Sequence, residues 1–238
     1  MTVTAQALTE DVLIPRRRRS AEPLAAYLAR PADEGPHPAV VVIHELYGLN
    51  DNIRDFARRF ADVGYLALAV DLFSGGGNRN LCILRVMSAL MIRPLNNKGL
   101  SDLRRSIDWL QQRPDVDADR VGAIGFCMGG GYALALACVE RDLRASSAFY
   151  CFNPRPLSAI GRACPIIGSY PGKDWSARSG RKLDAALDEF NVPHDIKIYP
   201  GASHSFFNDT LDSHHPEAAA DAWQRTLAFF DDHMGSVD

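Results

Sequence analysis

The chain has 238 residues, of which 47% are hydrophobic and 23% charged. These values are those of an ordinary soluble globular protein, and they argue against a membrane-embedded or intrinsically disordered chain. A formal net charge of −3 and a pI near 6.2 create no field that would attract nucleic acid.

Two alternating segments open the chain. Residues 3–14 and 23–30 alternate apolar and polar side chains and are stopped by Pro15 and Pro31, so we expect an antiparallel pair of strands. The four arginines at 16–19 are expected to be solvated or to guard a sheet edge. An export signal would need a long apolar core after these arginines. Residues 20–30 form too short and too polar a segment for such a core, so we expect a cytoplasmic protein.

Alternation of strands and helices follows. Residues 39–43 are apolar on both sides of the chain, as in a central parallel strand. Residues 51–63 keep helical spacing between a capping Asn50 and a terminating Gly64, and residues 65–70 form the next strand. Strand, helix and strand at this spacing predict a right-handed parallel crossover.

Residues 81–92 are almost wholly apolar, with only Arg85 and Ser88 as exceptions. A core helix explains such a run. Its position after a strand, between the glycines at 75–77 and Pro94, also suits a lid or pocket wall. Both interpretations stay open, and we treat residues 74–98 as a possible lid or pocket-wall insertion.

The remaining elements continue the alternation. Helices are expected at 101–112, 178–190 and 216–233, strands at 121–124, 145–151, 165–170 and 195–199, and a turn at 115–120. No internal repeat appears. The pattern predicts a single α/β domain over residues 1–238, with a mostly parallel central sheet and helices on both faces.

Residues 120–135 read RVGAIGFCMGGGYALA, which is a short apolar strand, a sharp turn and a helix. Glycines two residues before and after a central side chain let strand and helix approach closely, as in the G-x-S-x-G nucleophile turn of α/β hydrolases. Cys127 occupies the serine position. A thiol at a helix N-terminus is expected to have a lowered pKa. The alternative, a small buried structural cysteine, is disfavoured by the surrounding glycines.

The five cysteines, at 82, 127, 138, 151 and 164, are odd in number and lack a CxxC spacing. They indicate free thiols in a reducing cytoplasm and not a disulfide framework or a zinc site. The sequence shows no metal cluster and no specific nucleotide-binding loop, so we expect neither a metal nor another cofactor.

A cysteine nucleophile in acyl transfer needs a base, and the base needs an orienting acid. In this fold the chain order is nucleophile, acid, base. His204 directly follows the last expected strand and is the candidate base, whereas His194 precedes that strand. Asp174 follows the strand at 165–170 and is the candidate acid. A loop histidine that is hydrogen-bonded only for structure is the alternative for His204.

Backbone N–H groups complete the expected site. Those of Met128, after the nucleophile, and Leu46, after the strand at 39–43, are the candidates for an oxyanion hole. Glu45 stands in the same loop beside the expected thiol. It is either a charged loop residue in water or a carboxylate that holds the thiol proton in the resting protein.

Together these residues resemble the dienelactone hydrolase family, the cysteine branch of the α/β hydrolases. The resemblance covers about residues 21–230 and rests on HELYGLN at 44–50, DLF at 71–73, GFCMGG at 125–130, GKD at 172–174 and GASHSF at 201–206. It implies ester or lactone hydrolysis through a thioester intermediate, with a triad of Cys127, Asp174 and His204. It also implies that Glu45 holds the thiol proton.

One departure from the family concerns substrate recognition. Members that cleave dienelactone have two arginines that grip the substrate carboxylate, and here Gly75 and Asn208 stand in their places. A bidentate arginine clamp has no neutral substitute. Arg79, Arg85 or Lys173 can compensate, although nothing in the sequence requires it. The candidate substrate-binding residues are Tyr47, Arg79, Arg85, Phe206 and Asn208.

The leading hypothesis is a cysteine-dependent carboxylic ester hydrolase, an esterase or lactonase. The apolar residues 81–92, with Phe206 and Phe207, favour a small neutral or hydrophobic ester. The alternatives are a true dienelactone hydrolase, a non-catalytic ligand-binding protein of the same fold and a redox-sensing thiol protein. We expect a small-molecule partner and neither nucleic acid nor membrane; the sequence makes no prediction of the oligomeric state.

Overall fold

The structure is a computed structural model that describes residues 6–16, 22–74 and 78–237. Its strands are β1 (Leu8–Ile14), β2 (Leu24–Arg30), β3 (His37–Ile43), β4 (Leu66–Val70), β5 (Val116–Phe126), β6 (Leu143–Phe149), β7 (Ile166–Pro171) and β8 (His194–Tyr199). Its helices are α1 (Asp51–Asp62), α2 (Arg79–Ile92), α3 (Lys98–Gln111), α4 (Met128–Val139), α5 (Ser176–Glu189) and α6 (Pro216–Met234), with a 3-10 helix η1 (Leu157–Arg162).

The strands form one sheet in the order β1-β2-β4-β3-β5-β6-β7-β8. β1 is antiparallel to β2, and β2 is antiparallel to β4, which confirms the expected antiparallel opening. All pairs from β4 to β8 are parallel. The carboxyl ends of these parallel strands therefore meet at one edge of the sheet, where open α/β sheets bind their ligands.

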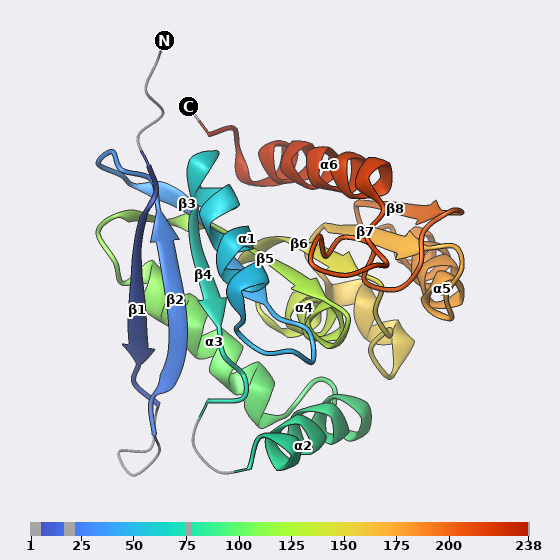
Figure 1. Cartoon of the computed structure of the whole chain (residues 1–238). Coiled ribbons are helices and arrows are strands. Elements are labelled where there is room, and N and C mark those ends of the chain that lie inside the picture. The colour runs from blue at the N-terminus through green and yellow to red at the C-terminus, as the bar shows by residue number, and fades with distance from the viewer. Residues whose placement is uncertain (1–5, 17–21, 75–77, 238) are drawn as a thin grey trace.

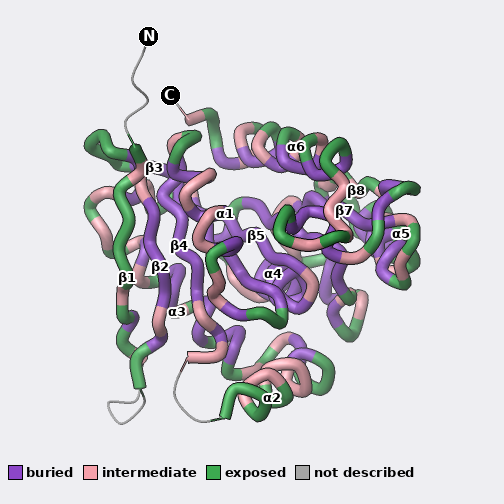
Figure 2. Tube along the Cα trace, in the orientation of Figure 1, coloured by how far each residue is buried: buried purple, intermediate pink, exposed green. Residues whose placement is uncertain are grey.

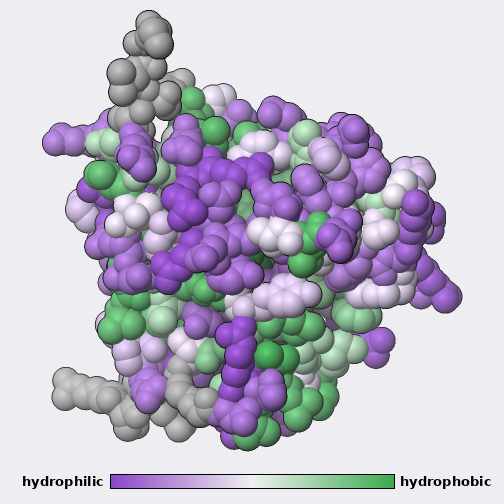
Figure 3. Space-filling view, in the orientation of Figure 1, coloured by the Kyte–Doolittle hydropathy of each residue, from purple (hydrophilic) through white to green (hydrophobic). Residues whose placement is uncertain are grey.

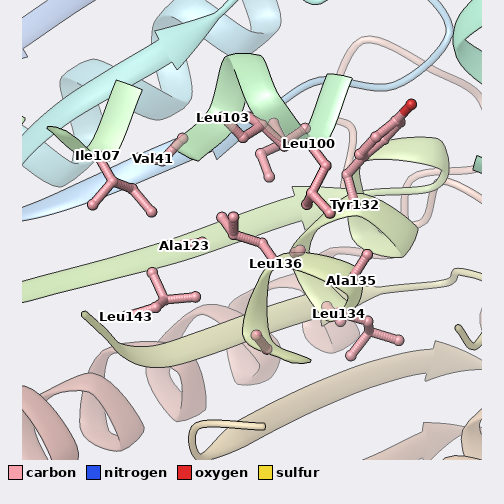
Figure 4. Packing of buried hydrophobic residues seen from close by; sticks show 14 of the residues in the cluster. Val41, Leu100, Leu103, Ile107, Ala123, Tyr132, Leu134, Ala135, Leu136 and Leu143 are labelled. Atoms are coloured by element: carbon pink, nitrogen blue, oxygen red, sulfur yellow. The ribbon is translucent and has the colours of Figure 1, made fainter. Parts of the chain in front are cut away.

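Helices cover both faces of the sheet, which confirms the expected α/β fold (Figure 1). On one face, α1 and α6 enclose an aromatic-rich cluster that includes Phe60, Phe126 and Phe230. On the other face, α3 and α4 pack on the central strands, and Figure 4 shows Leu103 and Leu136 in this layer. The central strands are buried throughout (Figure 2) because both of their faces are covered.

Several predicted boundaries were wrong, including those of β5 and α3. Residues 116–120 of the expected turn belong to β5, which begins at Val116 and changes register between Val121 and Gly122. The helix expected to begin at Ser101 begins at Lys98, because the side-chain oxygen of Asn97 accepts a hydrogen bond from the backbone N–H of Leu100 at 3.0 Å. The short helix η1 was not expected.

Helix α2 lies outside the layers of the sheet, at the bottom of the view in Figure 1. Only Leu90 of its residues is buried, so the core-helix interpretation of residues 81–92 is wrong. Leu81, Leu84, Met91 and Ile92 are all exposed. Figure 3 shows the resulting hydrophobic surface in the same part of the view. An apolar composition therefore does not mark a core element here.

The sequence suggested that Arg16 is solvated or guards a sheet edge, but in the structure its side chain is nearly buried. Its guanidinium forms two hydrogen bonds of 2.9 Å with the carboxylate of Asp102 on α3, and both side chains are 8% exposed. It also donates to the carbonyl oxygens of Glu22 and Ser74. The other three arginines of the run, 17–19, lie outside the described residues, as do the glycines 75–77.

Candidate active site

Cys127 is the single residue between β5 and α4, with φ 54° and ψ −113°. A non-glycine residue in this region is strained, and the tight packing around it keeps it there. A Cβ on Gly125 would lie 2.0 Å from the carbonyl oxygen of Gly129, and one on Gly129 would lie 2.2 Å from that of Ile43. The glycine spacing therefore reflects a real close approach of strand to helix, as a nucleophile turn requires.

The resting thiol of Cys127 is neutral. Burial raises its pKa to about 11, and the negative charge of Glu45 adds to this effect. The Met128 N–H acts in the opposite direction, by hydrogen bonding to the sulfur, but it does not outweigh them. The sequence-based expectation of a lowered pKa was wrong, because the helix N-terminus is opposed by desolvation and by a nearby carboxylate.

His204 and Asp174 meet at the carboxyl edge of the sheet. Asp174 follows β7, His204 follows β8, and His204 Nδ1 donates a hydrogen bond to Asp174 Oδ2. The same carboxylate oxygen accepts from the Ser176 hydroxyl at 3.0 Å, and the Asp174 side chain is only 7% exposed. With the proton on Nδ1, Nε2 of a neutral imidazole is an acceptor. The pair has the arrangement of an oriented general base.

Glu45 is 5% exposed, which excludes the interpretation of a carboxylate in water. Its Oε1 accepts from the Ser205 hydroxyl at 3.0 Å and its Oε2 from the Asn208 amide at 3.4 Å. The hydroxyl of Tyr150 also hydrogen-bonds to this carboxylate, and burial followed by the Glu45 charge raises the pKa of Tyr150 well above its ordinary value. Neutral donors therefore hold a buried carboxylate beside the thiol.

His44 fixes the start of the loop that carries Glu45. Its Nε2 accepts from the backbone N–H of Leu72 at 3.1 Å, so its proton is on Nδ1, which lies 2.6 Å from the carbonyl oxygen of Glu45. The loop after β3 is thereby tied to the end of β4.

The expected substrate-binding residues divide into two groups. Tyr47 and Arg79 lie near each other, since Arg79 Nη2 donates to the Tyr47 carbonyl oxygen, and Arg85 is exposed on α2. The prediction that Phe206 binds substrate was wrong, because its side chain is fully buried. It packs against Phe149, Tyr150 and Tyr199. Asn208, the other expected substrate-binding residue from this loop, is 3% exposed, and its side-chain amide donates to Glu45 and not into open space. Gly75 lies outside the described residues.

Sequence reasoning missed two aromatic residues beside the base. Trp175 lies over His204 with the ring centroids 5.8 Å apart, and Phe152 stacks on Trp175 at 3.9 Å. Both are partly open to solvent, at 47% and 39% exposure. Trp175 directly follows the acid, and that position was a usable signal. Phe152 lies 25 residues after Cys127 in the chain, and no local pattern marks it.

Fold and site together define a hydrolase of the α/β-hydrolase class. The model of the "Dienelactone hydrolase family" matches residues 24–234. A Saccharolobus solfataricus protein named "Putative carboxymethylenebutenolidase" is 35% identical, over 87% of this chain and 93% of its own. A Bradyrhizobium protein named "Probable 2-oxo-3-(5-oxofuran-2-ylidene)propanoate lactonase" is 31% identical, over 88% of this chain and 89% of its own.

A solved structure agrees with these relatives. The crystal structure named "Putative Dienelactone Hydrolase" from Klebsiella pneumoniae is 32% identical, with a TM-score of 0.82 over 94% of this chain and 98% of that one. The chain belongs to the dienelactone hydrolase family, and it is an ester or lactone hydrolase of that family. None of the helices within the described ranges is long and apolar enough to cross a membrane.

Proposed function

We propose that the chain hydrolyses a carboxylic ester or lactone through a thioester on Cys127. The observation that carries this proposal is the His204–Asp174 hydrogen bond, formed between two loops at the sheet edge that also holds the Cys127 turn. An oriented imidazole near a strained thiol at a helix N-terminus serves acyl transfer. A protein that only binds ligands has no need of this arrangement.

In the proposed reaction the Cys127 thiol stays protonated until the substrate arrives, because burial and Glu45 disfavour the thiolate. As the sulfur attacks the carbonyl carbon, His204 Nε2 takes the thiol proton. The N–H groups of Leu46 and Met128 stabilise the oxyanion. The imidazolium, held by Asp174, then gives its proton to the leaving oxygen, and the alcohol departs from a thioester.

The second half of the reaction returns the protein to its starting state. His204 takes a proton from water as the water oxygen attacks the thioester carbonyl. The carbon–sulfur bond then breaks, and the imidazolium returns its proton to the sulfur, so the acid product leaves and the neutral thiol is restored. Over the full cycle one water is consumed: its proton replaces the thiol proton that left with the alcohol, and the imidazole is neutral again at the end.

The substrate is proposed to have a small, hydrophobic body. The exposed aromatic rings of Trp175 and Phe152 beside His204, and the apolar surface of α2, support this choice. Phe206 and Phe207 no longer support it, since both are buried. Asn208 has no free side chain with which to replace an arginine clamp, so we expect p-nitrophenyl esters to be cleaved faster than dienelactone.

The test is to trap the acyl intermediate. The protein is quenched with acid during turnover of p-nitrophenyl acetate, and the mass of the chain and its peptides is measured. We expect an acetyl group on the peptide with Cys127, release of that group by hydroxylamine, and no activity in Cys127→Ala. Cys151→Ala, which removes a buried thiol, is the matched control and should keep its activity. Full activity in Cys127→Ala, or acetylation elsewhere, would refute the proposal.

A further inference from the structure

A pocket of about 220 Å³ lies next to the candidate active site. It is formed between the end of α2, the start of α4, the segment before η1 and the first turns of α5, and Leu90, Gly131, Phe152 and Leu157 are among its apolar lining residues. For comparison, an engineered cavity of about 150 Å³ holds benzene. The pocket is therefore large enough for part of a small organic substrate.

Two contacts connect this pocket to the reacting groups. Phe152 lines the pocket and stacks on Trp175, which in turn lies over His204. Gly131 lines the pocket from the first turn of α4, and its N–H donates to the carbonyl oxygen of Cys127 at 3.2 Å. A substrate held at Cys127 could thus extend past the two aromatic rings into the pocket.

The rim of the pocket is basic. Arg155 and Lys182 line it, both are exposed, and neither forms an ion pair with any residue that the structure describes. Among its described lining residues, Arg155 and Lys182 are the only charged side chains.

One lining residue, Asn153, carries an unsatisfied acceptor. The amide nitrogen of Asn153 donates to the carbonyl oxygen of Ser179 at 2.9 Å, which fixes the orientation of the amide. Its Oδ1 is buried and has no hydrogen-bond partner within the described residues. Buried acceptors of this kind are uncommon in folded proteins, but this oxygen is closed to solvent, so a bound molecule would reach it only if neighbouring side chains moved.

We propose that this pocket is a second substrate subsite, which binds the distal end of an ester whose apolar body ends in a carboxylate. Apolar lining residues and the two aromatic rings contact the body, and Arg155 and Lys182 pair with the carboxylate. The inference rests on the proposed function and narrows its substrate class to amphiphilic esters, such as half-esters of dicarboxylic acids. Anion recognition would then lie on the far side of Phe152 from the thiol and would not involve Asn208.

The test compares matched esters that differ only in a terminal charge. The kcat/KM of each ester is measured from proton release. The first pair, monomethyl adipate and methyl hexanoate, places the charge in the acyl part. The second pair, 6-acetoxyhexanoate and hexyl acetate, places it in the alcohol part. We expect the charged member to be preferred about tenfold in one series. Arg155→Gln combined with Lys182→Gln should abolish the preference by lowering kcat/KM for the charged ester about tenfold. Arg162→Gln, an exposed cation of η1 that does not line the pocket, should keep the preference.

A binding measurement separates this inference from the proposed function. Adipate is titrated calorimetrically into the Cys127→Ala protein, and the same double substitution should weaken its binding about tenfold, whereas Arg162→Gln should not. Equal kcat/KM for both members of each pair, or adipate binding that is unaffected by the double substitution, would overturn the subsite. If no ester is hydrolysed, the proposed function fails, and the adipate titration alone decides whether the subsite exists.

Discussion

Replacing Asp174 with asparagine should remove most of the activity without unfolding the protein. The Asp174 carboxylate is nearly buried and accepts hydrogen bonds from His204 Nδ1 and the Ser176 hydroxyl. Asparagine has almost the same shape but no charge. It can no longer stabilise the imidazolium that forms when His204 takes a proton.

The magnitude follows from the bond that is lost. A hydrogen bond to a charged partner contributes about 1.5–3 kcal/mol, which corresponds to a decrease of about 10- to 150-fold in rate. If the asparagine amide nitrogen faces His204, the loss is larger, because the proton then moves to Nε2 and the ring cannot accept the thiol proton. We therefore expect kcat/KM for p-nitrophenyl acetate to fall by at least about tenfold.

The matched control is Asp184→Asn on α5. Asp184 Oδ1 lies 3.4 Å from His194 Nε2, so this change also alters an aspartate–histidine contact, but at the start of β8 and away from the thiol. Its kcat/KM should stay within about twofold of the unmodified protein, since surface pairs contribute little. Thermal unfolding followed by circular dichroism verifies that both variants are folded. A folded Asp174→Asn protein with nearly unchanged kcat/KM would refute the assigned role of His204 and Asp174.

Two further predictions concern the thiol and the fold. Because the pKa of Cys127 is raised to about 11, its thiolate fraction grows with pH, so the rate of Cys127 alkylation by iodoacetamide, followed by peptide mass, should keep rising between about pH 7 and pH 10. A plateau below about pH 7 would instead indicate a resting thiolate–imidazolium pair. Arg16→Ala should lower the free energy of unfolding in urea by about 3 kcal/mol, since it leaves the nearly buried Asp102 carboxylate without its main partner. Arg144→Ala, which breaks an exposed pair with Asp119, should cost no more than about 1 kcal/mol, and equal losses in the two variants would contradict the reasoning.

Much of the fold could be predicted from local patterns. The run at 39–43 is apolar on both sides, and it became the fully buried β3. Asn50 and Gly64 marked the ends of α1 because an asparagine side chain caps the first turn and glycine takes φ +92° after the last. The boundary of α3 was misplaced because Asn97 and Ser101 are both acceptable caps, and only the packed helix shows which one is used.

The polar surroundings of the site could not be predicted in the same way. Glu45, Tyr150 and Ser205 come from three distant parts of the chain, and their convergence depends on how β3, β6 and the loop after β8 are aligned. The sign of the Cys127 pKa change depends on that convergence. A helix N-terminus alone favours the thiolate, but burial and a carboxylate from another strand oppose it, and no local pattern reports their proximity.

By itself, the sequence determined the elements, their alternation and the chain order of Cys127, Asp174 and His204, because short-range steric rules govern a glycine-flanked turn and a helix cap. The tertiary structure alone decided that α2 lies on the surface, that Phe206 is buried and that Phe152 stands between the base and a basic-rimmed pocket. Burial and electrostatics are properties of what surrounds a side chain in space, and most of those neighbours are distant in sequence.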